Sequence, residues 1–190
     1  MSFEMALLLF VIVAFGILFL RTKKQLQSTR ESSAALADIA QEQRETLRHG
    51  LYQRFKRSEN SDADNSFEFE YFVAELLTVV NESDVYVTKA AGDFGVDIEE
   101  RRDDGLHFYK VICSEKPVGY ESVAMLHSRV VKDGADGGCV ATTSTFTSAA
   151  AEYANAVGIE LLDGNDLLEL WEEAIEYRRS AARDFVPDAG

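Results

Sequence analysis

The stretch that decides the fold runs from Ala91 to Ile112 and reads Ala-Gly-Asp-Phe-Gly-Val-Asp-Ile-Glu-Glu-Arg-Arg-Asp-Asp-Gly-Leu-His-Phe-Tyr-Lys-Val-Ile. Val96 to Arg101 predicts a short strand, and Asp103 to Gly105 predicts a tight turn. Leu106 to Cys113 is rich in aromatic and β-branched residues, which favour a second strand. The stretch therefore predicts a β-hairpin.

Charged side chains lie at the open end of this hairpin, where Asp93 and Asp97 flank Gly95. Because side chains alternate along a strand, Lys110 shares a face with Phe108 and Ile112. A carboxylate that holds a divalent cation, beside a lysine, is the arrangement that metal-dependent hydrolysis of a phosphodiester requires. The alternative is a plain turn, in which Asp93 bonds its own backbone and Lys110 reaches solvent.

The N-terminus has the composition of a membrane anchor. Residues 5–20 carry no charge, and a helix of about 18 residues from Phe3 spans roughly 27 Å, close to the thickness of the bilayer hydrocarbon. Arg21, Lys23 and Lys24 follow the apolar run instead of preceding it, and no small-residue cleavage site follows, so we expect an uncleaved anchor and not a signal peptide. The positive-inside rule then places the rest of the chain in the cytoplasm, as a single-pass protein of the cytoplasmic membrane.

Charge divides the chain. Residues 1–60 hold nine Lys and Arg against six Asp and Glu, whereas residues 61–190 hold ten against twenty-seven. This acidity argues against a broad basic surface that grips nucleic acid. Two explanations remain open, namely a local cluster of cations or a salty cytoplasm in which an acidic surface aids solubility. Cys113 and Cys139 have no nearby partner at metal spacing, so we expect free thiols.

The order of expected elements predicts an α/β domain. After a helical juxtamembrane segment at residues 21–57, which either self-associates or is a solvated spacer, an acidic linker covers residues 58–66. The domain at residues 67–180 then reads α-β-β-β-α-β-α-β-α, a mixed sheet flanked by helices, and residues 181–190 form a tail. The further elements are expected at 67–80 (helix), 85–90 (strand), 120–131 (helix), 138–142 (strand), 146–157 (helix, capped by Ser144 or Thr145), 159–162 (strand) and 165–179 (helix).

Several ordered blocks carry a resemblance to a known family. They are Phe69-Glu70-x-x-Val73-Ala74-Glu75-Leu76-Leu77, Val87-Thr88-x-x-x-Gly92-Asp93-x-Gly95-Val96-Asp97, Lys116-Pro117-Val118-Gly119, Ala141-Thr142-Thr143-Ser144-x-Phe146-Thr147 and Gly158-Ile159-x-Leu161-Leu162-Asp163-Gly164-x-x-Leu167. Over about residues 66–172 the chain resembles the catalytic domain of the Mrr-like (type IV) restriction endonucleases. The resemblance implies the α-β-β-β-α-β nuclease core of the PD-(D/E)xK superfamily, with DNA as the partner and Mg²⁺ or Mn²⁺ as the cofactor.

The resemblance also implies roles for individual residues. Asp97 matches the aspartate that ligates Mg²⁺, and Glu70 matches the glutamate of the family's helix. The third motif, Gln-x-Lys, aligns with Lys110-Val111-Ile112, so isoleucine stands where the family has its lysine. Isoleucine can neither activate water nor stabilise charge at a phosphate. Lys110 projects from the same strand face about 7 Å earlier, and we expect its long side chain to substitute.

Three hypotheses follow from these residues. The first is a membrane-anchored, metal-dependent DNA endonuclease with Asp97, Glu70 and Lys110 at its active site and Asp97 and Glu70 as the metal ligands. The second is a degenerate nuclease fold that binds DNA or a protein partner at the membrane without cleavage. The third is a membrane scaffold whose juxtamembrane helix forms a homo-oligomer.

Overall fold

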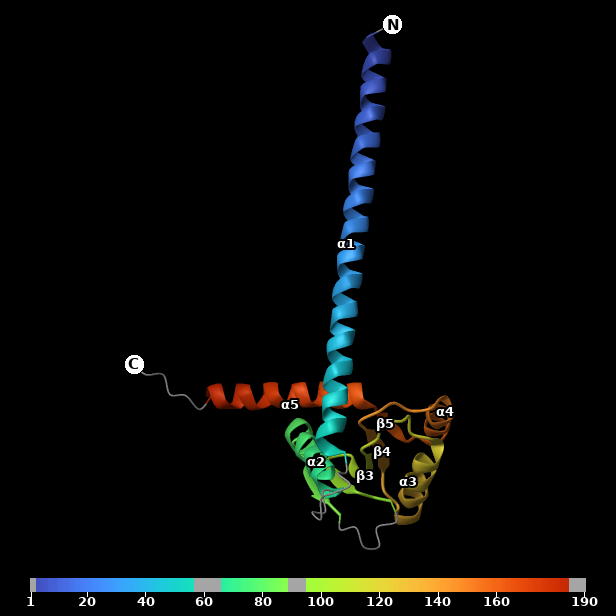
Figure 1. Cartoon of the computed structure of the whole chain (residues 1–190), viewed down its shortest axis with the longest axis vertical. Helices are drawn as coiled ribbons and strands as arrows, with labels where there is room; N and C mark the ends of the chain where they lie inside the picture. Colours follow the sequence, from blue (N-terminus) through green and yellow to red (C-terminus); the bar gives the residue numbers. More distant parts are fainter. Residues whose placement is uncertain (1–2, 57–65, 89–94, 185–190) are drawn as a thin grey trace, which may run out of the picture. The chain divides into compact units, whose positions relative to one another are not determined.

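The computed structural model describes residues 3–56, 66–88 and 95–184, and it divides the chain into two compact units, Met1–Gln43 and Arg44–Gly190. Helix α1 (Phe3–Phe55) supplies the first unit and continues into the second (Figure 1). Among the described residues, no helix carries an apolar segment long enough to cross a membrane. The side chains of residues 1–22 lie outside the description, so the anchor expected at residues 1–20 stays a prediction.

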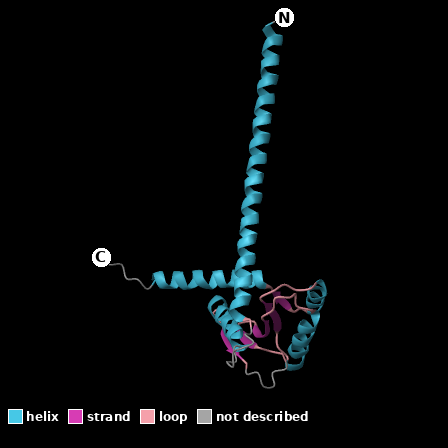
Figure 2. Ribbon diagram, viewed as in Figure 1, coloured by secondary structure: helices cyan, strands magenta, loops and turns pink. Residues whose placement is uncertain are grey.

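The second unit contains the predicted succession of strands and helices, drawn in Figure 2. Its elements are α2 (Ser66–Asn81), β1 (Asp84–Val87), β2 (Ile98–Arg102), β3 (Gly105–Ile112), α3 (Tyr120–Asp133), β4 (Gly137–Thr142), α4 (Ser148–Val157), β5 (Glu160–Leu162) and α5 (Gly164–Asp184). The predicted hairpin is confirmed, with residues 103 and 104 in its turn.

The strands form one mixed sheet in the order β1-β2-β3-β4-β5. The first three strands are antiparallel, and Ile98 lies opposite Tyr109 in the β2–β3 ladder. The last three strands are parallel, because α3 and α4 carry the chain back across the sheet between them. The open end of the hairpin therefore lies at the carboxyl end of β3.

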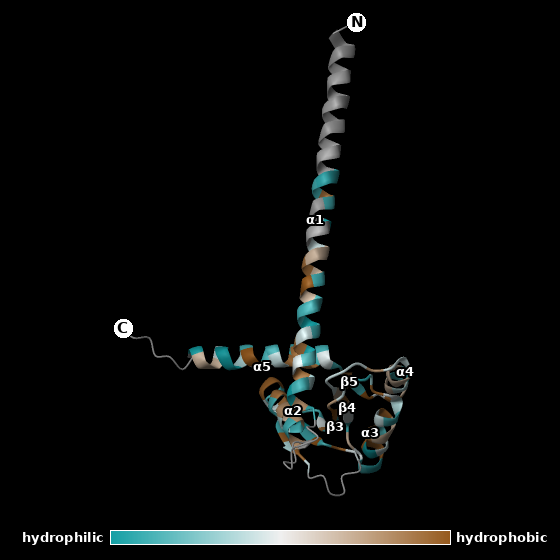
Figure 3. Cartoon of the chain, viewed as in Figure 1, coloured by the Kyte–Doolittle hydropathy of each residue, from teal (hydrophilic) through white to brown (hydrophobic). Residues whose placement is uncertain are grey.

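Helices cover both faces of this sheet, and each face has its own apolar core. On one face, α2, α5 and the end of α1 pack against the sheet through Phe69, Val73, Leu77, Ile98, Tyr109 and Leu167, among others. On the other face, α3 and α4 pack against it through Val96, Phe108, Val123, Leu126, Val140 and Ala154, among others. Figure 3 shows hydrophilic and hydrophobic residues mixed along these helices, as expected for helices that bury one side.

The last turns of α1 belong to the folded unit. Leu51 and Phe55 are 6% and 8% exposed, and the Phe55 ring lies 5.2 Å from Phe69 and 5.1 Å from Phe72 between ring centroids. The sequence led us to expect the domain from residue 67 and a self-associating or solvated helix before it. The compact unit instead begins at Arg44, because the apolar residues that end α1 complete the first core.

Candidate functional site

The backbone around Asp97 is fixed by hydrogen bonds on both sides. Asp97 lies just before β2, and its N–H donates to the Tyr109 carbonyl at 2.7 Å, while its own carbonyl accepts from the N–H of Thr88 at 2.9 Å. Its side chain is held as well, since Oδ2 accepts from the N–H of Val111 at 2.6 Å. Because this donor belongs to β3, the carboxylate is positioned by the strand that carries Lys110.

Lys110 lies directly beside this carboxylate. Its Nζ is 3.9 Å from Asp97 Oδ2, and the two side chains are 19% and 20% exposed. Opposite charges at this distance attract each other, and partial burial reduces screening by salt. The alternation predicted for β3 is confirmed, because Phe108 and Ile112 contribute to the core under α3 and α4, while Tyr109 and Val111 contribute to the opposite core. The structure therefore brings two of the three predicted site residues together.

Gly95 closes the site on the side of α3. It has φ +97°, a backbone conformation that residues with a side chain rarely adopt, and a Cβ there would lie 2.7 Å from Met125 Sδ. The same position is 3.8 Å from Lys110 Nζ, so the turn, Met125 of α3 and the lysine amine meet at one point. Asp93, the other aspartate of this stretch, lies outside the described residues.

Glu70 comes from a different side of the sheet. It lies half-buried on α2, next to the buried Phe69, and α2 covers the face opposite to the one that Lys110 shares with Phe108. Among the described residues there is no group of three or more His, Cys, Asp or Glu side chains that could hold a metal ion. Mg²⁺ is commonly bound by one or two carboxylates, with waters and substrate phosphates as its other ligands, so the partly exposed Asp97 remains compatible with it.

Ile112 occupies the position at which the resemblance expects a lysine. Its side chain contributes to the core beneath α3 and α4, and its carbonyl accepts a hydrogen bond from Thr142 Oγ1 at 2.8 Å. An apolar residue packed in this way supplies no charge to the site. The cation that the structure pairs with Asp97 is Lys110, at 3.9 Å.

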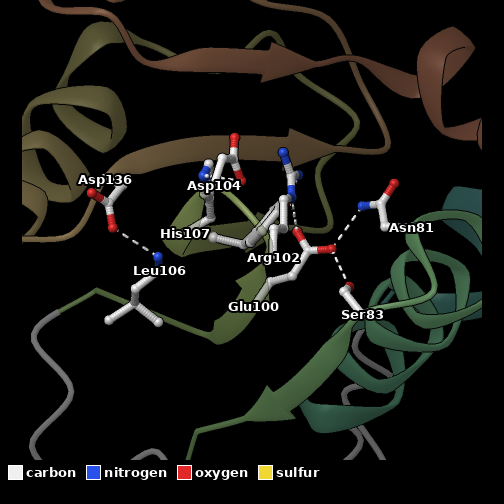
Figure 4. Close-up of polar contacts among 9 residues, drawn as sticks. Asn81, Ser83, Glu100, Arg102, Asp104, Leu106, His107 and Asp136 are labelled. Carbon is white, nitrogen blue, oxygen red and sulfur yellow. Dashed lines mark hydrogen bonds and ion pairs between the residues drawn. The ribbon is translucent and has the colours of Figure 1, made fainter.

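Sequence reasoning missed a buried carboxylate cluster around Glu100 (Figure 4). Glu100 is fully buried in β2, where it accepts hydrogen bonds from Asn81 (2.7 Å), Ser83 (2.5 Å), Arg102 (2.7 Å) and Tyr109 (2.5 Å). Burial alone would raise the pKa of this carboxyl, but the four donors outweigh it and leave the pKa below its ordinary value. The strand's alternation could have placed Glu100 on the Ile98 face, but it could not have named the donors.

Burial and the neighbouring Glu100 both raise the pKa of Tyr109. Burial first, and then the hydrogen bond to Glu100, raise the pKa of the Tyr109 phenol, so the phenol stays protonated and donates to the carboxylate. Arg102 donates to both of these groups and completes the cluster. Every contact of this cluster is internal, and we assign it a structural role.

Two hydroxyl residues after β4, Thr143 and Ser144, connect the loop that follows β4 to the loop that follows β3. Thr143 Oγ1 accepts from the N–H of Ser114 at 2.9 Å and also donates to the Ser114 carbonyl, while Ser144 Oγ donates to the Glu115 carbonyl at 3.1 Å. The expectation that Ser144 or Thr145 caps the next helix is wrong. Thr147 caps α4, and its side chain accepts from the N–H of Ala150 at 3.2 Å, because the helix begins only at Ser148.

Comparison with solved structures supports the architecture. The chain is similar to AspBHI, a DNA modification-dependent restriction endonuclease, with a TM-score of 0.52 and 20% identity over 73% of this chain and 35% of that one. It is similar to the MspJI restriction endonuclease, solved in complex with a 27-mer oligonucleotide, with a TM-score of 0.53 and 18% identity over 72% of this chain and 31% of that one. The chain thus spans about a third of either enzyme, and at this identity the likeness shows the fold. Among curated proteins, no relative matches.

The family is shown by the sequence itself. A profile described as restriction endonuclease, Mrr_cat, matches residues 61–171, which is more than half of the chain. This match covers the hairpin, helices α2, α3 and α4, the first turns of α5 and the Asp97–Lys110 pair, and it agrees with the observed mixed sheet. The chain belongs to the restriction endonuclease family of Mrr catalytic domains.

Proposed function

We propose that this protein is a membrane-anchored, metal-dependent DNA endonuclease that hydrolyses phosphodiester bonds at Asp97. The observation that carries this proposal is the Lys110 amine 3.9 Å from the carboxylate of Asp97, the residue that the resemblance matches to the metal-binding aspartate, in a chain of the restriction endonuclease family. The presence of an oligonucleotide in the similar MspJI structure supports DNA as the partner.

Asp97 would hold Mg²⁺ or Mn²⁺ together with water and phosphate oxygens. Glu70, the second ligand that the resemblance implies, stays a prediction, because its helix α2 covers the other face of the sheet. Such an ion, when bound, neutralises charge on the phosphate and favours attack by water. The N–H of Val111 donates a hydrogen bond to the Asp97 carboxylate and so fixes its orientation. Lys110 contributes a positive charge beside that carboxylate, where it can stabilise the charge that develops on the phosphate oxygens.

A second candidate function is favoured by Ile112. In the family pattern this position carries the lysine that acts on water, and here an apolar side chain packs into the core. A domain altered in this way would bind DNA, or a partner protein, at the membrane without cutting it. This candidate shares the fold and the DNA surface with the first, and it differs only in turnover.

The proposed membrane location rests on the sequence of the N-terminal segment. We propose that residues 1–20 anchor the protein, with Arg21, Lys23 and Lys24 on the cytoplasmic side, so that the nuclease unit acts in the cytoplasm. Self-association through the juxtamembrane helix at residues 21–57 is a further proposal, and Leu26, Leu36, Ile39 and Leu47 are the exposed apolar residues on that segment of α1.

The test is cleavage of plasmid DNA by the full-length chain in detergent, with Mg²⁺ or Mn²⁺, on methylated and unmethylated substrates. We expect the Lys110→Met variant to cut about 10² to 10⁴ times more slowly, the usual contribution of a group that assists proton transfer or charge stabilisation. Lys116→Met is the matched control, because Lys116 is an exposed lysine beyond the end of β3, and it should cut at the wild-type rate. A wild-type chain that binds DNA but leaves both substrates intact would instead establish the second candidate.

A further inference from the structure

The exposed side of α3 differs in charge from the rest of the acidic unit. Residues 122–132 contain His127, Arg129 and Lys132 and no acidic residue, although residues 61–190 as a whole carry twenty-seven Asp and Glu against ten Lys and Arg. Two acidic residues bound the stretch, and one of them, Asp133, is ion-paired with Arg129 at 2.6 Å. The stretch therefore carries two cations, Arg129 and Lys132, with no acidic residue between them, and a local gathering of cations is what an acidic protein needs if it is to bind nucleic acid.

Arg129 and Lys132 line a groove. A depression of about 300 Å³ is lined by Met125, Ser128, Arg129 and Lys132, which lie on one side of α3 at helical spacing, and none of the four is acidic. Met125 is 50% exposed and is the lining residue nearest to the start of α3. A hydroxyl, a guanidinium and an ammonium in a row are the side chains that usually contact phosphate oxygens.

Met125 connects the groove with the candidate site. The Met125 side chain lies against Gly95, and so does the Lys110 amine, which is in turn 3.9 Å from Asp97. From Met125 to Lys132 the helix rises about 10 Å. A DNA strand that rises about 3.4 Å per nucleotide covers this length in roughly three nucleotides.

From this continuity we propose that the groove on α3 holds the phosphate backbone of the DNA strand that passes Asp97 and Lys110. Ser128, Arg129 and Lys132 contact phosphates within three nucleotides of the one at Lys110. The inference rests on the proposed DNA partner, and it adds the surface and the direction along which the strand runs. It requires no cleavage, so it applies to either candidate function.

The experiment measures binding separately from cleavage. Full-length chain carrying Asp97→Asn, in detergent and without divalent metal, is titrated against a labelled 30-base-pair duplex by fluorescence anisotropy between 50 and 200 mM salt. Into this background we introduce Arg129→Gln and Lys132→Gln, singly and together. Arg179→Gln is the matched control, because Arg179 is an exposed cation on α5 that is likewise paired with a carboxylate, Glu176.

Each lost phosphate contact should reduce the slope of log K against log salt by about 0.9, so the double variant should lose about 1.8. At 100 mM salt we expect each single variant to bind about three to ten times more weakly. The charge-retaining Lys132→Arg variant should restore the slope, and the emission of Trp171 should be unchanged in every variant, which shows that the fold is intact. Arg179→Gln should leave both slope and affinity as they were.

The outcomes separate the inference from the proposed function. If the double variant keeps the slope and affinity of its parent, the strand runs elsewhere and the inference is wrong, while cleavage by the wild-type chain would still establish the endonuclease. If Arg179→Gln weakens binding as much as Lys132→Gln, the effect is one of net charge, and the groove is again excluded. A wild-type chain that neither binds nor cuts DNA overturns the proposed function and this inference together.

Discussion

Replacing Glu100 with glutamine removes the charge from a carboxyl group that is fully buried and accepts four hydrogen bonds. Asn81 and Ser83 donate to Oε1, whereas Arg102 and Tyr109 donate to Oε2. The amide offers only one acceptor oxygen, so one pair of donors must face an NH₂ group. Asn81 is exposed and Ser83 is half-buried, so water can replace their acceptor. Arg102 and Tyr109 are affected in either orientation, because they lose either the acceptor oxygen or its negative charge.

The expected loss of stability is set by the two donors that face Oε2, Arg102 and Tyr109. Hydrogen bonds to a charged group are each worth about 1.5–3 kcal/mol, which gives roughly 3–6 kcal/mol for two. Arg102 is 26% exposed, so water recovers part of its loss, whereas Tyr109 is 1% exposed and recovers little. We therefore expect Glu100→Gln to lower the free energy of unfolding by about 3–5 kcal/mol, as for other buried ion pairs that lose one partner.

The assay is urea denaturation of the full-length chain in detergent, followed by the emission of Trp171. This is the single tryptophan, and its ring lies 5.9 Å from Phe72 in the first core. With a slope of about 2 kcal/mol/M, the midpoint should fall by roughly 2 M while the slope stays constant. Glu99→Gln is the control, because Glu99 is the adjacent residue on the opposite face of β2, and it should change stability by about 0.5 kcal/mol or less.

The difference in the free energy of unfolding between wild type and Glu100→Gln should depend on pH. The folded-state pKa of Glu100 is lowered below its ordinary value of 4.5, so the stabilising contribution of the carboxylate is complete above that value and is lost as the pH falls through the lower folded pKa. The two proteins should thus differ most near pH 7 and converge below about pH 4. A Glu100→Gln protein within 1 kcal/mol of wild type at pH 7, or a gap that widens in acid, would refute this account of the cluster.

Two further substitutions test the core and the turn. Phe55→Ala should destabilise the unit by about 3–5 kcal/mol in the same urea assay, because the Phe55 side chain is only 8% exposed and its removal leaves a cavity among aromatic rings. Leu47→Ala on the same helix is the control, because Leu47 is 48% exposed and its loss should cost about 0.5 kcal/mol or less. Equal effects of the two substitutions would show that α1 does not complete the core. Gly95→Ala should lower the free energy of unfolding by about 1–3 kcal/mol, because an alanine is strained at φ +97°. It should also lower DNA cleavage, because the added Cβ would displace Met125 beside Lys110. A variant with wild-type stability and cleavage would contradict the geometry of this turn.

The sequence by itself determined the local structure and the family. Period-2 and helical spacing of apolar residues predicted the order of strands and helices, and the Asp103–Gly105 turn predicted the hairpin that places Lys110 opposite the strand led by Asp97. These features were accessible because they depend on residues close together in the chain. Asp97 and Lys110 are separated by one hairpin, and the register of a hairpin follows from its turn.

Only the tertiary structure decided contacts between distant segments. It assigned the end of α1 to the core, it surrounded Glu100 with donors from α2, β2 and β3, and it set Met125 of α3 against Gly95. Glu70 shows the same dependence, since its helix covers the face of the sheet opposite to Lys110, and no spacing in the sequence could place it. The physical reason is that local patterns fix which face of an element is apolar, whereas the partner of that face depends on how the whole chain packs.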